Sequence, residues 1–274
     1  MMIFTCPVCG EPLRRLEKTC ACPNGHSYDL AAEGYVHLLP PNRMHSKAPG
    51  DSKQMVASRR AFLQGGWYEP FSDKLNELAA ECVPAPSPVI LDAGCGEGYY
   101  TGRLREHLVS RGLAPRMFGF DISKSAVKAA AKKYGEIFFA VASMFEIPVQ
   151  SGSADCVVNV FAPIVEDELN RVLRPGGFLI LAVPGPRHLF GLKEILYDAP
   201  YENEHRETRY RGFRFQKRVA VPLEITLSDG DSIQNLFAMT PYYWKTPVEG
   251  SERLKNIKKL TTQIEFDFIL YQKV

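Results

Sequence analysis

Five short apolar runs alternate with helix-like segments in the middle of this chain of 274 residues. The runs are residues 88–93, 117–122, 137–142, 156–161 and 178–183, and the helix-like segments between them are 99–111, 124–134 and 165–173. Continuous apolar strands that alternate with helices predict a parallel sheet with helices on both faces. Segments 218–227 and 264–273 predict a sixth and a seventh strand. The predicted fold is therefore α/β with a seven-stranded sheet, and ligands should bind at the carboxyl ends of its strands.

The composition is that of an ordinary globular protein, with 45% hydrophobic and 23% charged residues. Because the net charge is only +2, any nucleic-acid binding must come from a local patch. No apolar run reaches the roughly 18 residues of a membrane helix, and the amino terminus lacks the pattern of a secretory signal. The seven cysteines are odd in number and unevenly clustered, which disfavours a disulfide framework. We expect a cytoplasmic protein with no membrane span.

Four potential metal ligands open the chain with the spacing C-x2-C-x12-C-x3-H. They are Cys6, Cys9, Cys22 and His26, and both pairs lie in turn-forming sequences, CPVCG and CPNGH. Four protein ligands leave zinc no position for water, so the predicted role is structural. On spacing alone Cys20 is an alternative to Cys22, and free thiols without a metal are the simpler interpretation. We expect residues 1–40 to form a zinc-binding module, since so short a segment cannot bury a sufficient core alone.

A polar, basic segment follows this module. We expect residues 41–66 to form a linker that faces RNA, and residues 67–274 to form the catalytic domain. Arg43, Lys47, Arg59 and Arg60 are the expected phosphate contacts of the linker. A solvated hinge explains the same charges equally well.

The sequence DAGCGEG lies where the first predicted strand becomes a helix. Gly94, Gly96 and Gly98 let a ligand approach the backbone there, although a tight turn alone also explains them. Asp121 ends the second strand, where an acid accepts hydrogen bonds from the ribose hydroxyls of a nucleotide. These residues together predict a nucleoside-binding site.

The residues around the glycines favour one kind of nucleoside ligand. A pyrophosphate-binding turn has the pattern G-x-G-x-x-G, whereas here Asp92 precedes the glycines and Glu97 lies among them. Acids repel a pyrophosphate but suit a ligand that carries an ammonium and a sulfonium, which predicts S-adenosylmethionine. Ser143 and Met144 follow the third strand, where they are expected to frame the adenine. The order of these features, with RVLRPGG before the fifth strand, resembles the class I methyltransferases.

A longer series of motifs, from Cys6 to Trp244, resembles one family in particular. It consists of CPVC, CPNGH, EGYVHLLP, PGDSKQM, RRAFLQGGWYEP, LDAGCGEGYY, FAP, VPGPRHL and MTPYYW. In this order the motifs resemble the guanine-N1 methyltransferases of 23S ribosomal RNA. The resemblance implies a Rossmann-like class I sheet with an antiparallel edge strand, S-adenosylmethionine as donor and a structural zinc ion. It also implies a guanine in an rRNA hairpin loop as the target, and a homodimer.

The resemblance also implies roles for individual residues. The implied zinc ligands are Cys6, Cys9, Cys22 and His26, and the implied donor contacts are Gly94, Cys95, Gly96, Asp121, Tyr68 and His188. From the sequence alone, Tyr68 is a core aromatic residue at a helix start, and His188 is a polar residue at a helix amino terminus. Residues 197–216 match the family least, and no role is transferred to them.

The catalytic residues are harder to predict. Ala162 and Pro163 follow the fourth strand and are expected to shape the slot for the acceptor base, with Phe161 beneath it. Guanine N1 must lose a proton when it is methylated, and Glu166 is the nearest carboxylate in the sequence. An acid here more often begins a helix, and water or the RNA could equally accept the proton.

A second basic stretch, residues 206–218, interleaves arginines with aromatic residues. It fits an RNA-stacking surface and a strand with one buried aromatic face equally well. Two other functions are compatible with the whole sequence. One is a small-molecule methyltransferase with a structural zinc module, and the other is a non-catalytic, zinc-containing RNA-binding protein.

Overall fold

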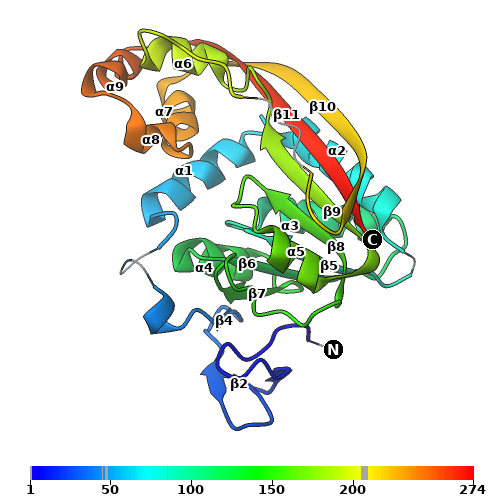
Figure 1. Cartoon of the computed structure of the whole chain (residues 1–274). Coiled ribbons are helices and arrows are strands. Elements are labelled where there is room, and N and C mark those ends of the chain that lie inside the picture. Colours follow the sequence, from blue (N-terminus) through cyan, green and yellow to red (C-terminus); the bar gives the residue numbers. More distant parts are fainter. Residues whose placement is uncertain (1, 45, 47–48, 85, 205–208) are drawn as a thin grey trace.

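The computed structural model describes residues 2–44, 46, 49–84, 86–204 and 209–274, and its centre is an eight-stranded sheet (Figure 1). In spatial order the strands are β10 (Phe213–Leu227), β11 (Leu260–Lys273), β9 (Leu173–Pro184), β8 (Ala154–Val160), β5 (Val89–Ala93), β6 (Arg116–Asp121), β7 (Phe138–Val141) and β4 (Val36–His37). Neighbouring strands are parallel, except that β11 is antiparallel to both β9 and β10.

All seven predicted strands form, and an eighth comes from the segment expected to belong to the zinc module. This strand, β4, pairs in parallel with the outer side of β7. The antiparallel strand was expected at the edge of the sheet. It is β11, and it lies one position inside the edge because β10 pairs along it from Phe213 opposite Lys273 to Leu227 opposite Leu260.

Successive residues of the central strands alternate between two cores, one on each face of the sheet. Ile90 and Val158 belong to one core, and their neighbours Leu91 and Val157 belong to the other. The three helices predicted between the strands all form: α3 (Tyr99–Ser110), α4 (Lys124–Lys133) and α5 (Glu166–Val172); another helix, α2 (Glu69–Cys82), precedes β5. Helices α2, α3 and α4 cover the first core, and α5 covers the second together with the amino-terminal residues, including Phe4. The result is the layered α/β arrangement that the sequence predicts.

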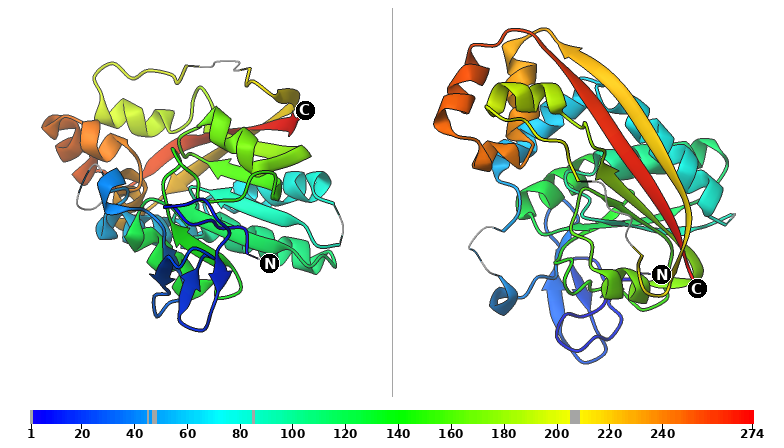
Figure 2. Two further views of the ribbon diagram at one scale, coloured as in Figure 1. Left: turned by 60° about the horizontal axis from the view of Figure 1, so that its bottom comes forward. Right: turned by 45° about the horizontal axis from the view of Figure 1, so that its top comes forward.

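Five further helices of the described chain gather at one end of the sheet (Figures 1 and 2). They are α1 (Lys53–Gln64), α6 (Phe190–Leu196), α7 (Gly230–Ala238), α8 (Tyr242–Lys245) and α9 (Val248–Lys255). Helix α1 occupies the second half of the expected linker and packs against α7. Its N-cap is Ser52, whose side chain accepts a hydrogen bond from the Met55 N–H. Within the described chain, no helix is long and apolar enough to cross a membrane.

The amino-terminal module has a three-stranded antiparallel sheet of its own, at the opposite end of the molecule from α6–α9 (Figure 1). Its strands are β1 (Arg14–Arg15), β2 (Thr19–Ala21) and β3 (Ser27–Asp29), and a short 3-10 helix, η1 (Pro41–Arg43), follows β4.

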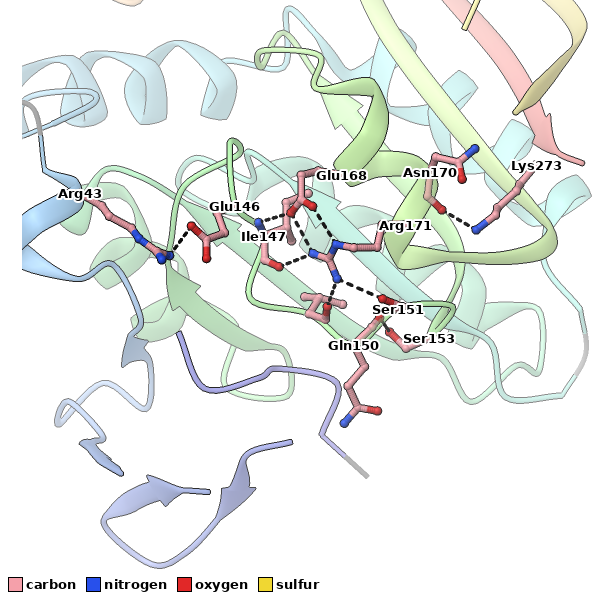
Figure 3. Close-up of polar contacts among 11 residues, drawn as sticks. Arg43, Glu146, Ile147, Gln150, Ser151, Ser153, Glu168, Asn170, Arg171 and Lys273 are labelled. Atoms are coloured by element: carbon pink, nitrogen blue, oxygen red, sulfur yellow. Dashed lines mark hydrogen bonds and ion pairs between the residues drawn. The ribbon is translucent and has the colours of Figure 1, made fainter. Parts of the chain in front are cut away.

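A turn at residues 147–150 attaches this module to the catalytic domain, and Arg171 and Glu168 bind the turn from its other side (Figure 3). The Thr5 N–H, next to the first cysteine, donates to the Pro148 carbonyl at 2.8 Å. Behind the turn, the Arg171 guanidinium of α5 donates to the Ile147 carbonyl at 2.6 Å and to both carboxylate oxygens of Glu168 at 2.7 and 2.8 Å. The metal module is therefore fixed to a turn that the catalytic domain itself holds rigid.

Candidate active site and metal centre

The predicted zinc ligands converge in the amino-terminal module. One ligand atom from each of Cys6, Cys9, Cys22 and His26 lies within 4.8 Å of the others. The Cys9 and Cys22 sulfurs are 3.7 Å apart, and His26 Nδ1 lies 3.4 Å from Cys22 Sγ and 3.6 Å from Cys6 Sγ. Tetrahedral zinc, with Zn–S near 2.3 Å and Zn–N near 2.0–2.1 Å, requires edges of about 3.8 and 3.6 Å. The geometry fits zinc with no open coordination position, hence a structural ion.

Cys20, the alternative that spacing left open, is not part of this cluster. It is fully buried on β2, where its thiol belongs to the second core, and burial raises the pKa of this thiol to about 11. Tyr28 instead supports the cluster, with its hydroxyl 3.0 Å from Cys6 Sγ. Hydrogen bonds of this kind orient the ligands of a metal site.

A cavity of about 560 Å³ lies at the carboxyl ends of β5, β6, β8 and β9. The glycine turn after β5 forms its floor, α1 forms one wall, and residues 239–242 form another. This is the position that the parallel sheet predicts for a ligand.

The glycines of this turn have positive φ angles. Gly94 has a φ of 90° and faces Ala162, where no Cβ would fit. Gly96 has a φ of 54°, and its N–H donates to Asp121 Oδ2 at 3.0 Å. The turn is thus left-handed and crowded, and it brings bare backbone to the surface of the cavity.

Asp92 is the buried acid of the cavity. Its Oδ2 accepts a hydrogen bond from Thr101 Oγ1 at 2.5 Å, whereas its Oδ1 has no partner among the described residues. Burial raises the pKa of this carboxyl to about 7. Buried carboxylate oxygens are almost always satisfied, so Oδ1 fits a positively charged ligand. Asp92 therefore supports a donor that carries an ammonium and a sulfonium.

Asp121 is held in a fixed orientation at the tip of β6. Its two oxygens accept hydrogen bonds from the Gly96 N–H at 3.0 Å and the Ser123 N–H at 2.8 Å. Each carboxylate oxygen keeps a second lone pair, which is the acceptor that a ribose hydroxyl needs. Desolvation within the cavity raises the pKa of Asp121, and the nearby Asp51 adds to this effect.

Cys95, Tyr68 and His188 line the same cavity. The Tyr68 ring packs edge-on against Phe266, with centroids 5.1 Å apart, so the sequence interpretation as a core aromatic residue also holds. His188 has a buried Nδ1 without a partner in the described chain. Burial, with Lys193 nearby, lowers the pKa of His188 to about 3, so its imidazole is neutral near pH 7.

Phe161, Ala162 and Pro163 line the cavity directly after β8, as predicted. Phe161 has a φ of 57°, is 45% exposed, and stacks on Phe71 with ring centroids 5.7 Å apart. A bulky residue in this left-handed conformation is strained, and such strain concentrates at functional sites.

Three predicted site residues lie outside the cavity, as far as the described chain shows. Ser143 pairs with Glu146 in a tight turn and lines a second cavity of about 510 Å³ beside the metal module. Met144 is buried in the second core. Glu166 begins α5 and accepts a hydrogen bond from the Arg211 N–H. For Glu166, the interpretation as a helix-starting acid is the one that agrees with the structure.

The four basic residues expected to contact phosphates have different environments. Arg59 lines the cavity from α1, and Arg60 lies 3.5 Å from the buried carboxylate of Glu97. Arg43 forms an ion pair with Glu146, and Lys47 lies outside the described residues. Sequence patterns did not place Arg59 in the cavity, because residues 53–64 were expected to be part of a linker rather than a helix.

For the basic stretch 206–218, the structure favours the strand interpretation. Tyr210 and Phe213 pack edge-on against Tyr271 of β11, with centroids 5.2 and 6.2 Å apart. Phe215 is 57% exposed, so one aromatic ring of this stretch remains accessible. Residues 205–208 lie outside the described chain.

The sheet, the acid-flanked glycine turn and the ribose acid define a class I methyltransferase that depends on S-adenosylmethionine. Family models agree: one for the amino-terminal zinc ribbon of RlmA matches residues 4–47, and one for a methyltransferase domain matches residues 90–177. The chain belongs, more specifically, to the 23S rRNA (guanine-N1)-methyltransferase family.

The family assignment rests on relatives that match most of the chain. The 23S rRNA (guanine(748)-N(1))-methyltransferase of Streptomyces fradiae is 34% identical over 272 residues, which cover 95% of this chain and 94% of the relative. Two relatives are named provisionally as 23S rRNA (guanine-N1)-methyltransferases. The relative from Micromonospora griseorubida is 35% identical, and the match covers 70% of this chain and 68% of the relative. The relative from Bacillus subtilis is 28% identical, and the match covers 99% of this chain and 97% of the relative.

Proposed function

We propose that this protein transfers the methyl group of S-adenosylmethionine to N1 of a guanine in 23S ribosomal RNA. The observation that carries the proposal is the cavity itself. It is lined by Asp92, whose Oδ1 has no partner among the described residues, and by Phe161–Pro163, which would border the planar base. The near full-length relation to the Streptomyces fradiae enzyme supports the choice of acceptor.

S-adenosylmethionine supplies a methyl group that the adjacent sulfonium already activates. The chain's contribution is therefore mainly to hold donor and acceptor in line. Asp121 receives the ribose hydroxyls, and Asp92 stabilises the positive end of the donor. Ala162 contacts the glycine turn, so its small side chain permits the base to approach the donor closely.

Guanine N1 loses its proton as the new N–C bond forms, and S-adenosylhomocysteine leaves with the electron pair of the broken C–S bond. Glu166 does not line the slot, and its carboxylate already accepts the Arg211 N–H. Phe161 is half exposed at the mouth of the cavity, so solvent reaches this point. We propose that water, rather than a protein carboxylate, accepts the proton.

The acceptor is proposed to be a guanine in a hairpin loop, because pairing in a stem hides N1. Arg43, Lys47 and Arg60 of the expected linker remain proposed phosphate contacts. A homodimer, which the family resemblance implies, and a cytoplasmic location, expected from the sequence, complete the proposal. All seven cysteines are free thiols, which fits a reducing compartment.

The decisive experiment offers radiolabelled donor to unmodified 23S rRNA and maps the product by primer extension. We expect a stop one nucleotide before a single guanine, since a methyl group at N1 blocks pairing. Label on another atom, or on no RNA, would contradict the proposal.

The two rival functions make different predictions. If the substrate is a small neutral molecule, its turnover should not fall steeply with salt, whereas rRNA binding should. If the protein is a non-catalytic RNA-binding module, the folded chain should give no calorimetric signal with S-adenosylmethionine. Light scattering of the purified protein tests the homodimer independently.

A further inference from the structure

Arg59 reaches the donor cavity from α1, a helix that belongs to the connection between the two domains. Its Nη1 forms an ion pair with Asp51, and its Nη2 donates to the Met239 carbonyl at 3.2 Å. A Cβ built on Gly96 would lie 3.8 Å from Arg59 Nη1. The guanidinium therefore lies beside the glycine turn, against which the donor must rest.

The charges of the cavity are strongly unbalanced. Four carboxylates line it: Asp51, Asp92, Glu97 and Asp121. Among the described lining residues, Arg59 is the only lysine or arginine, and His188 is neutral because burial lowers its pKa to about 3. Among the described lining residues, Arg59 is therefore the one cationic side chain with which an anionic group in this cavity can pair.

The donor brings such an anionic group. S-adenosylmethionine carries two positive groups, the sulfonium and the ammonium, and one negative group, the carboxylate of its methionine part. The positive groups suit the acids of the cavity, but a carboxylate transferred from water without a cation would be strongly unfavourable. We propose that Arg59 binds the donor carboxylate. This inference rests on the donor assigned above but not on the RNA acceptor.

The geometry of Arg59 leaves room for this contact. A guanidinium has five N–H donors in a planar fork, and the hydrogen bonds to Asp51 and Met239 use two of them. Its side chain is 28% exposed, so it is accessible from the cavity while its position is fixed. The main-chain carbonyl of Asp51 accepts a hydrogen bond from Ser123 Oγ at 2.7 Å, which anchors the partner of Arg59 beside the ribose acid Asp121.

The test compares two ligands that differ in the group Arg59 is proposed to bind. S-adenosylhomocysteine has the amino-acid part, whereas 5′-methylthioadenosine has the same nucleoside and sulfur but neither carboxylate nor ammonium. In calorimetry with the full-length protein, we expect Arg59→Ala to weaken the affinity for S-adenosylhomocysteine about tenfold to hundredfold. This range corresponds to the loss of a charge-assisted hydrogen bond. Binding of 5′-methylthioadenosine should change by less than about twofold. Arg59→Lys should have an intermediate effect, since it keeps the charge but loses the fork.

Lys53→Ala is the matched control, because it removes an exposed cation from the same helix. It should leave both affinities unchanged. Equal weakening of both ligands by Arg59→Ala, or loss of 5′-methylthioadenosine binding, would show that Arg59 acts through the structure of the cavity and would overturn the proposal. An unchanged affinity for S-adenosylhomocysteine would also overturn it. If the unmodified protein binds neither ligand, the donor assignment itself fails, whereas a failed rRNA assay leaves this comparison intact.

Discussion

Ala162 Cβ lies where a side chain of Gly94 would have to be, because a Cβ built on that glycine would be only 2.3 Å away. The two residues come from different strand ends, β5 and β8, which are neighbours in the sheet. Because these two residues are in contact, the donor-binding turn lies directly beside the slot proposed for the acceptor base. Methyl transfer requires this proximity, since the reacting atoms must align in a single step.

Gly94→Ala should therefore disrupt both the fold and donor binding. The substitution combines the clash with Ala162 and a φ of 90°, and we expect a loss of about 3 kcal/mol in the free energy of unfolding. Urea unfolding and calorimetric titration with S-adenosylhomocysteine measure the two effects. Gly135→Ala is the control, because its φ is not left-handed and no atom lies within 4 Å of the added Cβ. Equal behaviour of the two variants would contradict the structure of the turn.

Asp92 should make donor binding depend on pH. Its pKa is raised to about 7, so the ligand-free carboxyl holds a proton below that pH and must release it to pair with a cation. The affinity for S-adenosylmethionine should rise about tenfold from pH 6 to pH 8, and Asp92→Asn should remove most of this rise. Calorimetry in buffers of different ionisation enthalpy would detect the released proton. A pH-independent affinity in the unmodified protein would contradict this role.

The same shift has the opposite effect on ligand-free stability. Between about pH 4 and pH 7 the folded protein keeps a proton that the unfolded chain has already lost. The contribution of Asp92 to stability is therefore present at low pH and is lost as the pH rises through 7. Thermal melts of the unmodified protein and of Asp92→Asn across this range should converge at the acidic end and separate above it.

Zinc should depend on Cys9 and not on Cys20. We expect about one zinc ion per chain in the unmodified protein and in Cys20→Ser, and a large loss in Cys9→Ser. Mass spectrometry of the metal content measures this directly. Binding of S-adenosylhomocysteine should survive in Cys9→Ser, because the donor cavity contains no zinc ligand. Loss of zinc from Cys20→Ser at retained fold would reinstate the alternative ligand.

Phe161 should matter for the acceptor more than for the donor. Its exposed ring at the mouth of the cavity offers a stacking surface, and stacking on one base contributes about 1–3 kcal/mol. Phe161→Ala should lower rRNA methylation about tenfold or more at saturating donor, with little change in S-adenosylhomocysteine affinity. Phe145→Ala is the comparison, since Phe145 is 74% exposed but is not among the residues that line the donor cavity. Equal activities of the two variants would argue against stacking on Phe161.

Local patterns in the sequence were sufficient to predict the strands of the sheet and the metal cluster. The apolar runs predicted the strands because burial on both faces leaves a continuous signal, and the cysteine spacing predicted the metal cluster because zinc geometry is strict. Ser143 and Met144 are not among the residues that line the donor cavity, because a tight turn, bridged by Ser143 and Glu146, follows β7. Arg59 was expected at a phosphate because helix α1 has only a weak apolar stripe, and its partners Asp51 and Met239 are 8 and 180 residues away.

The short strand β4 belongs by sequence to the metal-bearing head but by pairing to the sheet of the catalytic body. Val36 and His37 complete the far border of the sheet, so a chain cut at residue 41 would lose more than the head. It would leave the hydrogen-bonding groups along β7 uncovered, a template on which other chains could pair and aggregate. A severed catalytic fragment should thus be recovered as insoluble material, even though every residue of its donor site would still be present.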